Sequence, residues 1–257
     1  MIPAIFFGHG NPMNALEDNA YTRVWRKMGA GLPRPRAIVA VSAHWYLPGV
    51  RVTAMAQPRT IHDFGGFPPE LYGVRYPAPG DAALAGRVAE LLRPRPVSLD
   101  QGWGLDHGTW SVLCHVYPQA DIPVVQLSVQ PHLGPAHHLA VGRALASLKD
   151  EDLLVIGSGS ATHNLEEFYY GAHAPDEPAL RWVEAFTDWV HEKVTAGDLD
   201  ELLRYRERAP YAVENHPTDE HLLPLFIALG AGDGAAGRRV HASTRGGVIS
   251  MDTYAFG

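Results

Sequence analysis

The chain has 257 residues, 46% hydrophobic and 19% charged, so it is long and apolar enough to bury a full core. Its formal net charge of −7 argues against a surface that binds nucleic acid or an anionic membrane. Cys114 is the only cysteine, which excludes disulfides and thiolate metal clusters. The apolar N-terminus lacks the basic region of a signal peptide, and no segment approaches the roughly 20 apolar residues of a spanning helix. We expect a cytoplasmic protein with one catalytic domain, residues 1–257, and small-molecule partners. The oligomeric state is left open.

Short apolar runs, typical of strands buried on both faces, alternate with helical patterns along the chain. The expected strands are 2–7, 37–43, 52–55, 123–129 and 153–157, and two late runs, 239–242 and 247–251, could add edge strands. The expected helices are 81–92, 110–117, 135–148, 177–194, 199–205 and 218–229. A Pro- and Gly-rich stretch, 64–79, is expected to be a long ordered loop near the site. This alternation predicts an α/β fold, a three-layer domain with a mostly parallel or mixed central sheet between helices.

Several of the 14 histidines follow the ends of predicted strands. His9 lies between two glycines directly after the first strand, and His44 follows the second. In an open α/β sheet, ligands bind beyond the carboxyl ends of the strands, and imidazole is the commonest metal-binding side chain. The two positions together therefore predict a metal site with nitrogen and oxygen ligands. For each histidine alone, a ring hydrogen-bonded to a backbone carbonyl is the alternative.

Two further histidines follow in Gly-containing turns. His107 lies two residues before Thr109, which could cap the next helix, and His163 follows the predicted strand 153–157 in a loop of small residues. Each could be a metal ligand, an acid/base group or a structural histidine.

His216 and His221 are five residues apart at the start of the last predicted helix, with Thr218 as its expected N-cap. Two rings at this spacing do not share a helix face, so only one is expected to bind the metal. We favour His221, in the first turn of that helix. Aromatic and imidazole side chains next to these candidates could line a substrate pocket: Trp45, His62, Phe64, Trp103 and Tyr211.

Five motifs in chain order resemble the DOPA 4,5-dioxygenase branch of the class III extradiol ring-cleavage dioxygenases. They occupy 8–16 (GHGNPMNAL), 42–45 (SAHW), 60–68 (TIHDFGGFP), 106–110 (DHGTW) and 217–225 (PTDEHLLPL). The similarity extends almost end to end and is weakest around 210–215. It implies one metal ion bound by His9, His44 and His221, with Fe²⁺ for activity and Zn²⁺ often found in its place. It also implies acid/base roles for His163 and His107.

The resemblance implies cleavage of a catechol such as DOPA by O2, beside rather than between the two hydroxyls. We assign proton abstraction to His163 and hydrogen-bond donation to His107. Three histidines form a neutral ligand set that zinc accepts equally well, so a zinc-dependent hydrolase remains open, as does a non-catalytic metal-binding protein on this scaffold. Asp106, Glu214 and Glu220 are the carboxylates nearest in sequence, and any of them could orient a ligand histidine.

Overall fold

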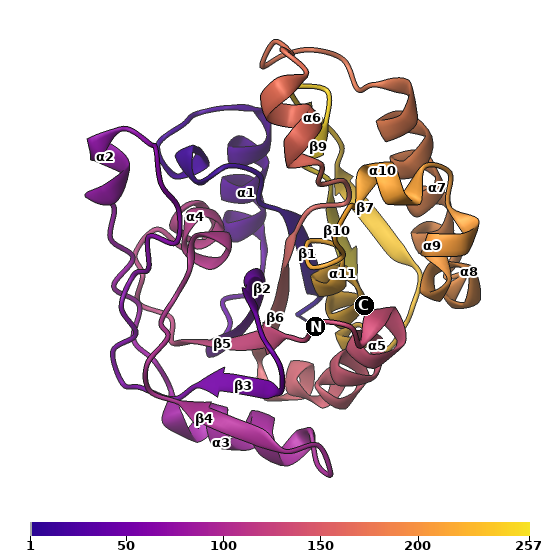
Figure 1. Ribbon diagram of the computed structural model, residues 1–257. Coiled ribbons are helices and arrows are strands. Elements are labelled where there is room, and N and C mark those ends of the chain that lie inside the picture. Colours follow the sequence, from indigo (N-terminus) through magenta and orange to yellow (C-terminus); the bar gives the residue numbers. More distant parts are fainter. Residues whose placement is uncertain (1) are drawn as a thin grey trace.

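The structure, a computed structural model, describes residues 2–257. A mixed sheet of eight strands crosses the molecule (Figure 1) in the order β4 (Val97–Asp100), β3 (Val50–Thr53), β5 (Val124–Val129), β2 (Ala37–Tyr46), β6 (Leu153–Gly159), β1 (Ala4–Gly8), β10 (Thr253–Phe256) and β7 (Gly237–His241). Two short strands, β8 (Thr244–Arg245) and β9 (Ile249–Ser250), form a separate antiparallel pair.

The four central strands of the sheet are parallel. β5, β2, β6 and β1 pair in parallel, whereas β3 and β10 join this group in antiparallel orientation. The carboxyl ends of the central strands therefore meet at one edge, where the sequence predicts the site. Neither β4 nor β10 was predicted, because each has only four residues and gains its stability from pairing. The expectation that 247–251 adds an edge strand to the main sheet is wrong, because this run contributes β9 to the small sheet.

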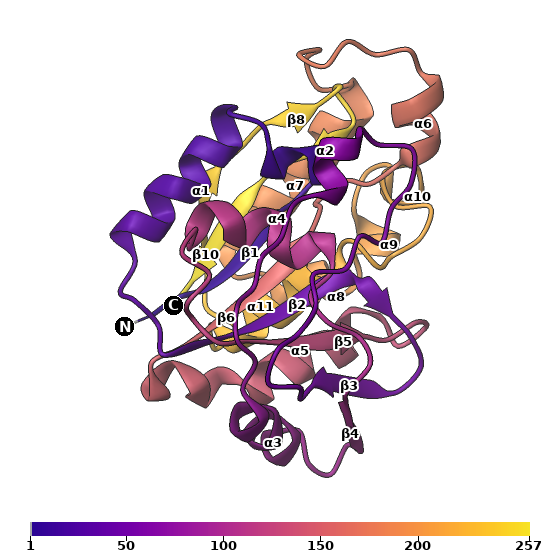
Figure 2. The same ribbon diagram turned by 90° about the vertical axis from the view of Figure 1, so that its left-hand side faces the viewer.

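Helices cover both faces of the sheet, as two views at right angles show (Figures 1 and 2). They are α1 (Ala20–Gly31), α2 (Pro69–Tyr72), α3 (Ala82–Leu91), α4 (His107–Val116), α5 (Gly134–Ala144), α6 (Leu165–Tyr170), α7 (Arg181–Ala196), α8 (Leu199–Leu203), α9 (Tyr205–Arg208), α10 (Ala212–Asn215) and α11 (Leu223–Ala231), with 3-10 turns η1 (Pro12–Ala15) and η2 (Ala146–Glu151). Within residues 2–257, no helix combines the length and the apolar character needed to cross a bilayer.

Two hydrophobic cores lie on opposite faces of the sheet because successive strand side chains point to opposite sides. Phe6 and Val39 pack in a core with residues of α5, α7 and α11. Ile5, Phe7 and Ile38 pack in the other core, with residues of α1 and α4. All five side chains are fully buried. The apolar runs are therefore continuous rather than alternating, and the predicted three-layer arrangement is observed.

The last predicted helix, 218–229, begins later than expected. α11 starts at Leu223, and 218–222 form turns before it. Thr218 does not cap the helix, because its hydroxyl donates to the side chain of Glu220 at 3.0 Å. His221 consequently lies in the turn that leads into α11. Two other predicted helices are each divided, 135–148 into α5 and η2, and 199–205 into α8 and the start of α9.

Candidate metal centre

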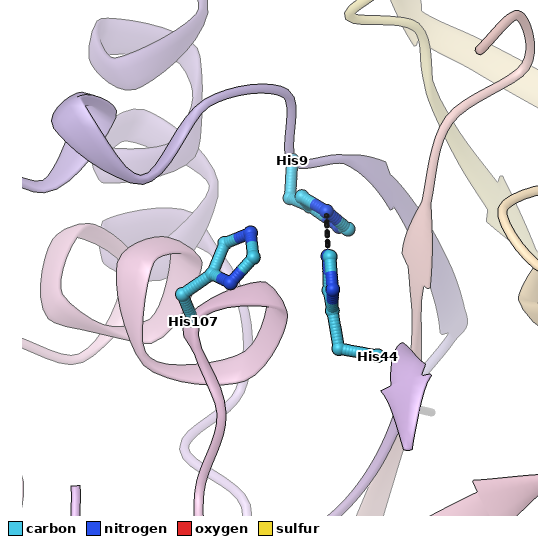
Figure 3. Close-up of side chains that lie close together, drawn as sticks. All are labelled: His9, His44 and His107. Atoms are coloured by element: carbon cyan, nitrogen blue, oxygen red, sulfur yellow. Dashed lines mark hydrogen bonds between the residues drawn. The ribbon is translucent and has the colours of Figure 1, made fainter. Parts of the chain in front are cut away.

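Three histidines from separate elements meet at the carboxyl edge of the sheet (Figure 3). His9 follows β1 directly, and His107 is the first residue of α4. His44 was expected after a strand but lies within β2, which stays extended to Tyr46. The pairing of β2 with β6 ends at Ser42, so His44 belongs to the part of the strand that extends past β6.

The carboxylate of Asp106 forms the N-cap of α4. It accepts a hydrogen bond from the backbone N–H of Thr109 at 3.3 Å, so the expectation that Thr109 is the cap is wrong. The Thr109 hydroxyl instead donates to Gln126 at 2.9 Å, and the Gln126 amide contacts Asp106. Burial and, next, the charge of Asp63 raise the pKa of Asp106 to about 6. This buried network fixes the first turn of α4, which carries His107.

The end of β6 brings His163 and His221 together. A Cβ on Gly159 would lie 2.0 Å from the carbonyl oxygen of His221, so only glycine allows this approach. The same carbonyl accepts a hydrogen bond from the backbone N–H of Ser160 at 2.8 Å. The rings of His163 and His221 stack, with centroids 3.4 Å apart and planes 8° from parallel.

Hydrogen bonds determine which nitrogen of His9 carries the proton. The hydroxyl of Ser158 donates to the carbonyl of Gly108 and therefore accepts from Nδ1 of His9, at 3.0 Å. The lone pair of His9 is consequently on Nε2. This atom lies 3.0 Å from Nε2 of His44 (Figure 3).

One carboxylate, Asp63, orients both His44 and His107. Its Oδ1 accepts the backbone N–H of His107 at 2.9 Å, and Oδ2 lies 3.0 Å from Nδ1 of His107 and 3.5 Å from Nδ1 of His44. The ring of His107 therefore keeps its proton on Nδ1 and presents a lone pair at Nε2, and the same carboxylate favours a proton on Nδ1 of His44. Burial opposes ionisation of Asp63, but the hydrogen bonds and charge of His107, with His44, outweigh it and lower its pKa to about 2.

The third ligand candidate, His221, is held in the same way by Glu220. Nδ1 of His221 lies 3.0 Å from Oε1 of Glu220, and its buried Nε2 has no hydrogen-bond partner among residues 2–257. Glu220 is thus the one of the three carboxylates named from the sequence that contacts a candidate ligand. Asp106 caps α4, and Glu214 contributes only its backbone carbonyl, to Asn164 at 2.7 Å.

Four imidazoles of this cluster are held in their neutral form: His9, His44, His163 and His221. Burial lowers the pKa of His9, His44 and His221 well below the ordinary value, and the neighbouring histidines lower it further. Burial and, next, His107 lower the pKa of His163 to about 4. Neutral rings can bind a cation directly, without first losing a proton.

Ring spacing indicates which histidines can share one ion. A metal bound about 2.0–2.1 Å from each Nε2, with tetrahedral angles, places the ring centroids of its ligands about 5 Å apart. The centroids of His9, His44 and His221 are 5.0, 5.0 and 5.4 Å apart. Ring nitrogens of His9, His44 and His107 lie within 4.8 Å of one another, and His163, Glu220 and His221 form a second group of the same kind. The centroid of His107, however, is only 3.9 Å from that of His44. That is too close for two ligands of one tetrahedral ion.

The three Nε2 atoms themselves fit a cation. Nε2 of His9 and Nε2 of His44 form a hydrogen bond of 3.0 Å, and Nε2 of His221 is buried without a partner in the described chain. A cation bound by these three nitrogens would take the place of the hydrogen bond and would satisfy the unpaired nitrogen of His221. The residues present therefore fit a metal ion with an all-nitrogen ligand set.

A cavity of about 170 Å³ opens onto this cluster. Its lining includes four of the five clustered histidines: His44, His107, His163 and His221. Apolar and aromatic side chains form much of the rest: Phe64, Phe67, Leu165, Phe168, Tyr169 and Ile249. Walls of this composition are typical of pockets for small apolar or aromatic molecules.

Of the five side chains predicted to line the pocket, only Phe64 is found in the cavity wall. Trp45 is buried and stacks on Trp103, with centroids 5.6 Å apart. The ring of His62 contacts a backbone carbonyl at 3.1 Å. Tyr211 is 51% exposed at the start of α10. Adjacent residues of a strand point to opposite faces, so Trp45 cannot accompany His44 into the cavity.

Three side chains that contact the histidine cluster or line the cavity were not identified from the sequence. Asp63 lies inside the motif 60–68, and a carboxylate beside a cluster of candidate ligands is a usable signal. Ser158 follows a glycine near the end of a predicted strand and looks like any small loop residue. Arg245, which lines the cavity, has no distinguishing pattern around it.

Comparison with known proteins identifies the family of the chain. The family described as "Catalytic LigB subunit of aromatic ring-opening dioxygenase" matches residues 5–256. The 4,5-DOPA dioxygenase extradiol of Escherichia coli (strain K12) is 50% identical over 237 residues, 91% of this chain and 86% of that protein. The protein of the same description from Beta vulgaris is 40% identical over 259 residues, 98% of this chain and 95% of that protein. A crystal structure of an uncharacterized E. coli K12 protein, 42% identical, matches 100% of both chains with a TM-score of 0.85. The predicted α/β fold is thereby confirmed.

Proposed function

Because this chain belongs to the family of catalytic LigB subunits of aromatic ring-opening dioxygenases and is an extradiol dioxygenase, we propose that it cleaves a catechol such as DOPA with O2 at a metal ion held by His9, His44 and His221. The observation that carries this proposal is the spacing of the three imidazole rings, whose centroids lie 5.0, 5.0 and 5.4 Å apart next to an aromatic-walled cavity. The names of the two relatives support DOPA as the substrate.

A ferrous ion in this position would provide coordination sites for both catechol oxygens and O2. We propose Fe²⁺ for activity, with Zn²⁺ as a second ion that the same three nitrogens would accept. The acceptors on the three Nδ1 atoms, from Ser158, Asp63 and Glu220, fix the rings so that only Nε2 is available to the ion.

His163 and His107 have complementary tasks in this proposal. His163 lines the cavity and is neutral, so it can take a proton from a catechol hydroxyl. His107 also lines the cavity and has Asp63 behind it, so the carboxylate can neutralise the charge when the ring is protonated. Such a ring donates a hydrogen bond from Nε2 to an oxygen of the bound reactants. The phenylalanine walls orient the ring and exclude water.

The test loads the protein with Fe²⁺ under anaerobic conditions, adds DOPA and then admits air. We expect oxygen consumption together with a yellow ring-opened product. Elemental analysis of the His221→Ala variant should show loss of the metal. His163→Ala should retain the metal and lose roughly 10²- to 10⁴-fold in rate, as expected for an acid/base group.

A matched control is His137→Ala. His137 is a partly buried histidine whose ring bonds Gln130 at 3.1 Å, outside the cavity lining. This variant should keep both metal and rate. If His163→Ala empties the site, or if His221→Ala keeps full occupancy, the ligand assignment fails. Absence of oxygen uptake with every catechol tried would overturn the proposed reaction.

A further inference from the structure

The charge of the cavity lining is concentrated on one residue. Among residues 2–257, Arg245 is the only lysine or arginine in the lining, and no aspartate or glutamate lines the cavity. We propose that Arg245 binds the carboxylate of the substrate, so that the enzyme selects catechols whose side chain carries a carboxylate. This inference rests on the proposed function and adds the part of the substrate remote from the reacting ring.

One edge of the Arg245 guanidinium is already occupied. Nη1 and Nη2 donate to the two carboxylate oxygens of Glu17 at 2.8 and 3.1 Å, and Nη1 also donates to Asn14 at 3.0 Å and Tyr21 at 3.1 Å. None of these three partners lines the cavity. Glu17 and Tyr21 instead line a second cavity, of about 500 Å³, together with Arg245, so the occupied edge belongs to that second cavity.

The other edge is open. The N–H of Nε and the second hydrogen of Nη2 have no acceptor among residues 2–257. These two groups are parallel and match the two oxygens of a carboxylate, which a guanidinium binds in a bidentate manner. Arg245 lines the cavity, whereas the residues that bind its occupied edge do not. The open edge is therefore the one that the guanidinium can offer to a ligand.

The structure also holds Arg245 at a set distance from the metal ligands. Asn14, which accepts from Arg245, donates through Nδ2 to the backbone carbonyl of His9 at 2.8 Å. Two hydrogen bonds thus connect the guanidinium to a proposed ligand. Arg245 lies on β8, opposite Ile249 of β9, which lines the same cavity. The arrangement can therefore select the length of the substrate side chain as well as its charge.

The pairing with Glu17 limits the size of the effect. Two opposite charges 2.8 Å apart largely cancel at longer range, so the attraction for an anion comes mainly from direct hydrogen bonds. A charge-assisted pair of this kind corresponds to about 10- to 100-fold in affinity. We therefore expect the affinities for an anionic substrate and for a neutral one of equal size to differ by no more than this factor.

The experiment measures anaerobic binding to the Fe²⁺-loaded protein by calorimetry. The two probes are dihydrocaffeate, a catechol with a short carboxylate side chain, and its primary amide, which has the same size and no charge. The wild-type protein should bind the carboxylate about 10- to 100-fold more tightly. Arg245→Gln should lose most of this preference by weakening the carboxylate and leaving the amide nearly unchanged. Arg245→Lys keeps the positive charge near Glu17 but lacks the second pair of parallel N–H groups. Its preference for the carboxylate should lie between those of the wild-type protein and Arg245→Gln.

The matched control is Arg23→Gln, which removes the same charge from a side chain that is 66% exposed on α1. It should keep the wild-type preference. Equal binding of the two probes by the wild-type protein overturns the proposal whether or not any variant folds, and so does an unchanged preference in folded Arg245→Gln. Admission of air then tests the reaction separately. Ring opening without a carboxylate preference would refute only the role of Arg245, whereas a preference without ring opening would refute the proposed function.

Discussion

Replacement of Asp63 by asparagine should weaken metal binding while leaving the fold intact. The change keeps size and removes the charge that holds Nδ1 of His107 at 3.0 Å and lies 3.5 Å from Nδ1 of His44. An amide has one acceptor oxygen for the three donors that the carboxylate serves, the backbone N–H of His107 and the two ring Nδ1 atoms, so at least one of these donors loses its acceptor. Loss of such a partner typically costs 10- to 100-fold in metal affinity or activity, about 1.4–2.7 kcal/mol.

The assay is competition for Zn²⁺ between the protein and a chromophoric chelator, followed by oxygen uptake of the Fe²⁺-loaded protein. Asp106→Asn is the matched control, because this buried carboxylate lies next to His107 and hydrogen-bonds Thr109 and Gln126 rather than an imidazole. Asp106→Asn should mainly lower the free energy of unfolding, with a smaller effect on the affinity for Zn²⁺. If Asp63→Asn binds zinc as tightly as the wild-type protein, the assignment of Asp63 as the orienting group for His44 is refuted.

Two further predictions concern stability. Burial raises the pKa of Asp252 to about 6 although Arg239 is nearby, so the folded state binds more protons than the unfolded state between about pH 4 and pH 6. Stability should therefore fall as pH rises through this window, and thermal unfolding of Asp252→Asn should show a smaller fall. If Asp252→Asn shows the same pH dependence of stability as the wild-type protein, Asp252 is not the group responsible for the fall. In Gly142→Ala, the added Cβ would lie 2.2 Å from the backbone oxygen of Ile227, so α5 and α11 must separate. Chemical denaturation should show a loss of about 1–3 kcal/mol, and wild-type stability would contradict this packing.

The strand pattern and several site positions were accessible from the sequence. Buried parallel strands need apolar residues on both faces, so the runs that became β1, β2, β5 and β6 were visible without any tertiary information. His9 and His163 follow such runs, and the end of a strand is where a parallel sheet offers its site. The five motifs identified the family, which the comparisons confirm.

The tertiary structure alone decided which side chains touch. Asp63 reaches His44 and His107 because a loop crosses the end of the sheet, and Arg245 reaches the cavity because the β8–β9 pair folds back toward β1. Contacts between segments so distant in sequence depend on strand order and loop path, which leave no local pattern. The short strands β4 and β10 escaped prediction for the same reason, since pairing rather than composition stabilises them. Local chemistry therefore revealed which residues could act, and long-range packing determined their partners and the direction of each lone pair.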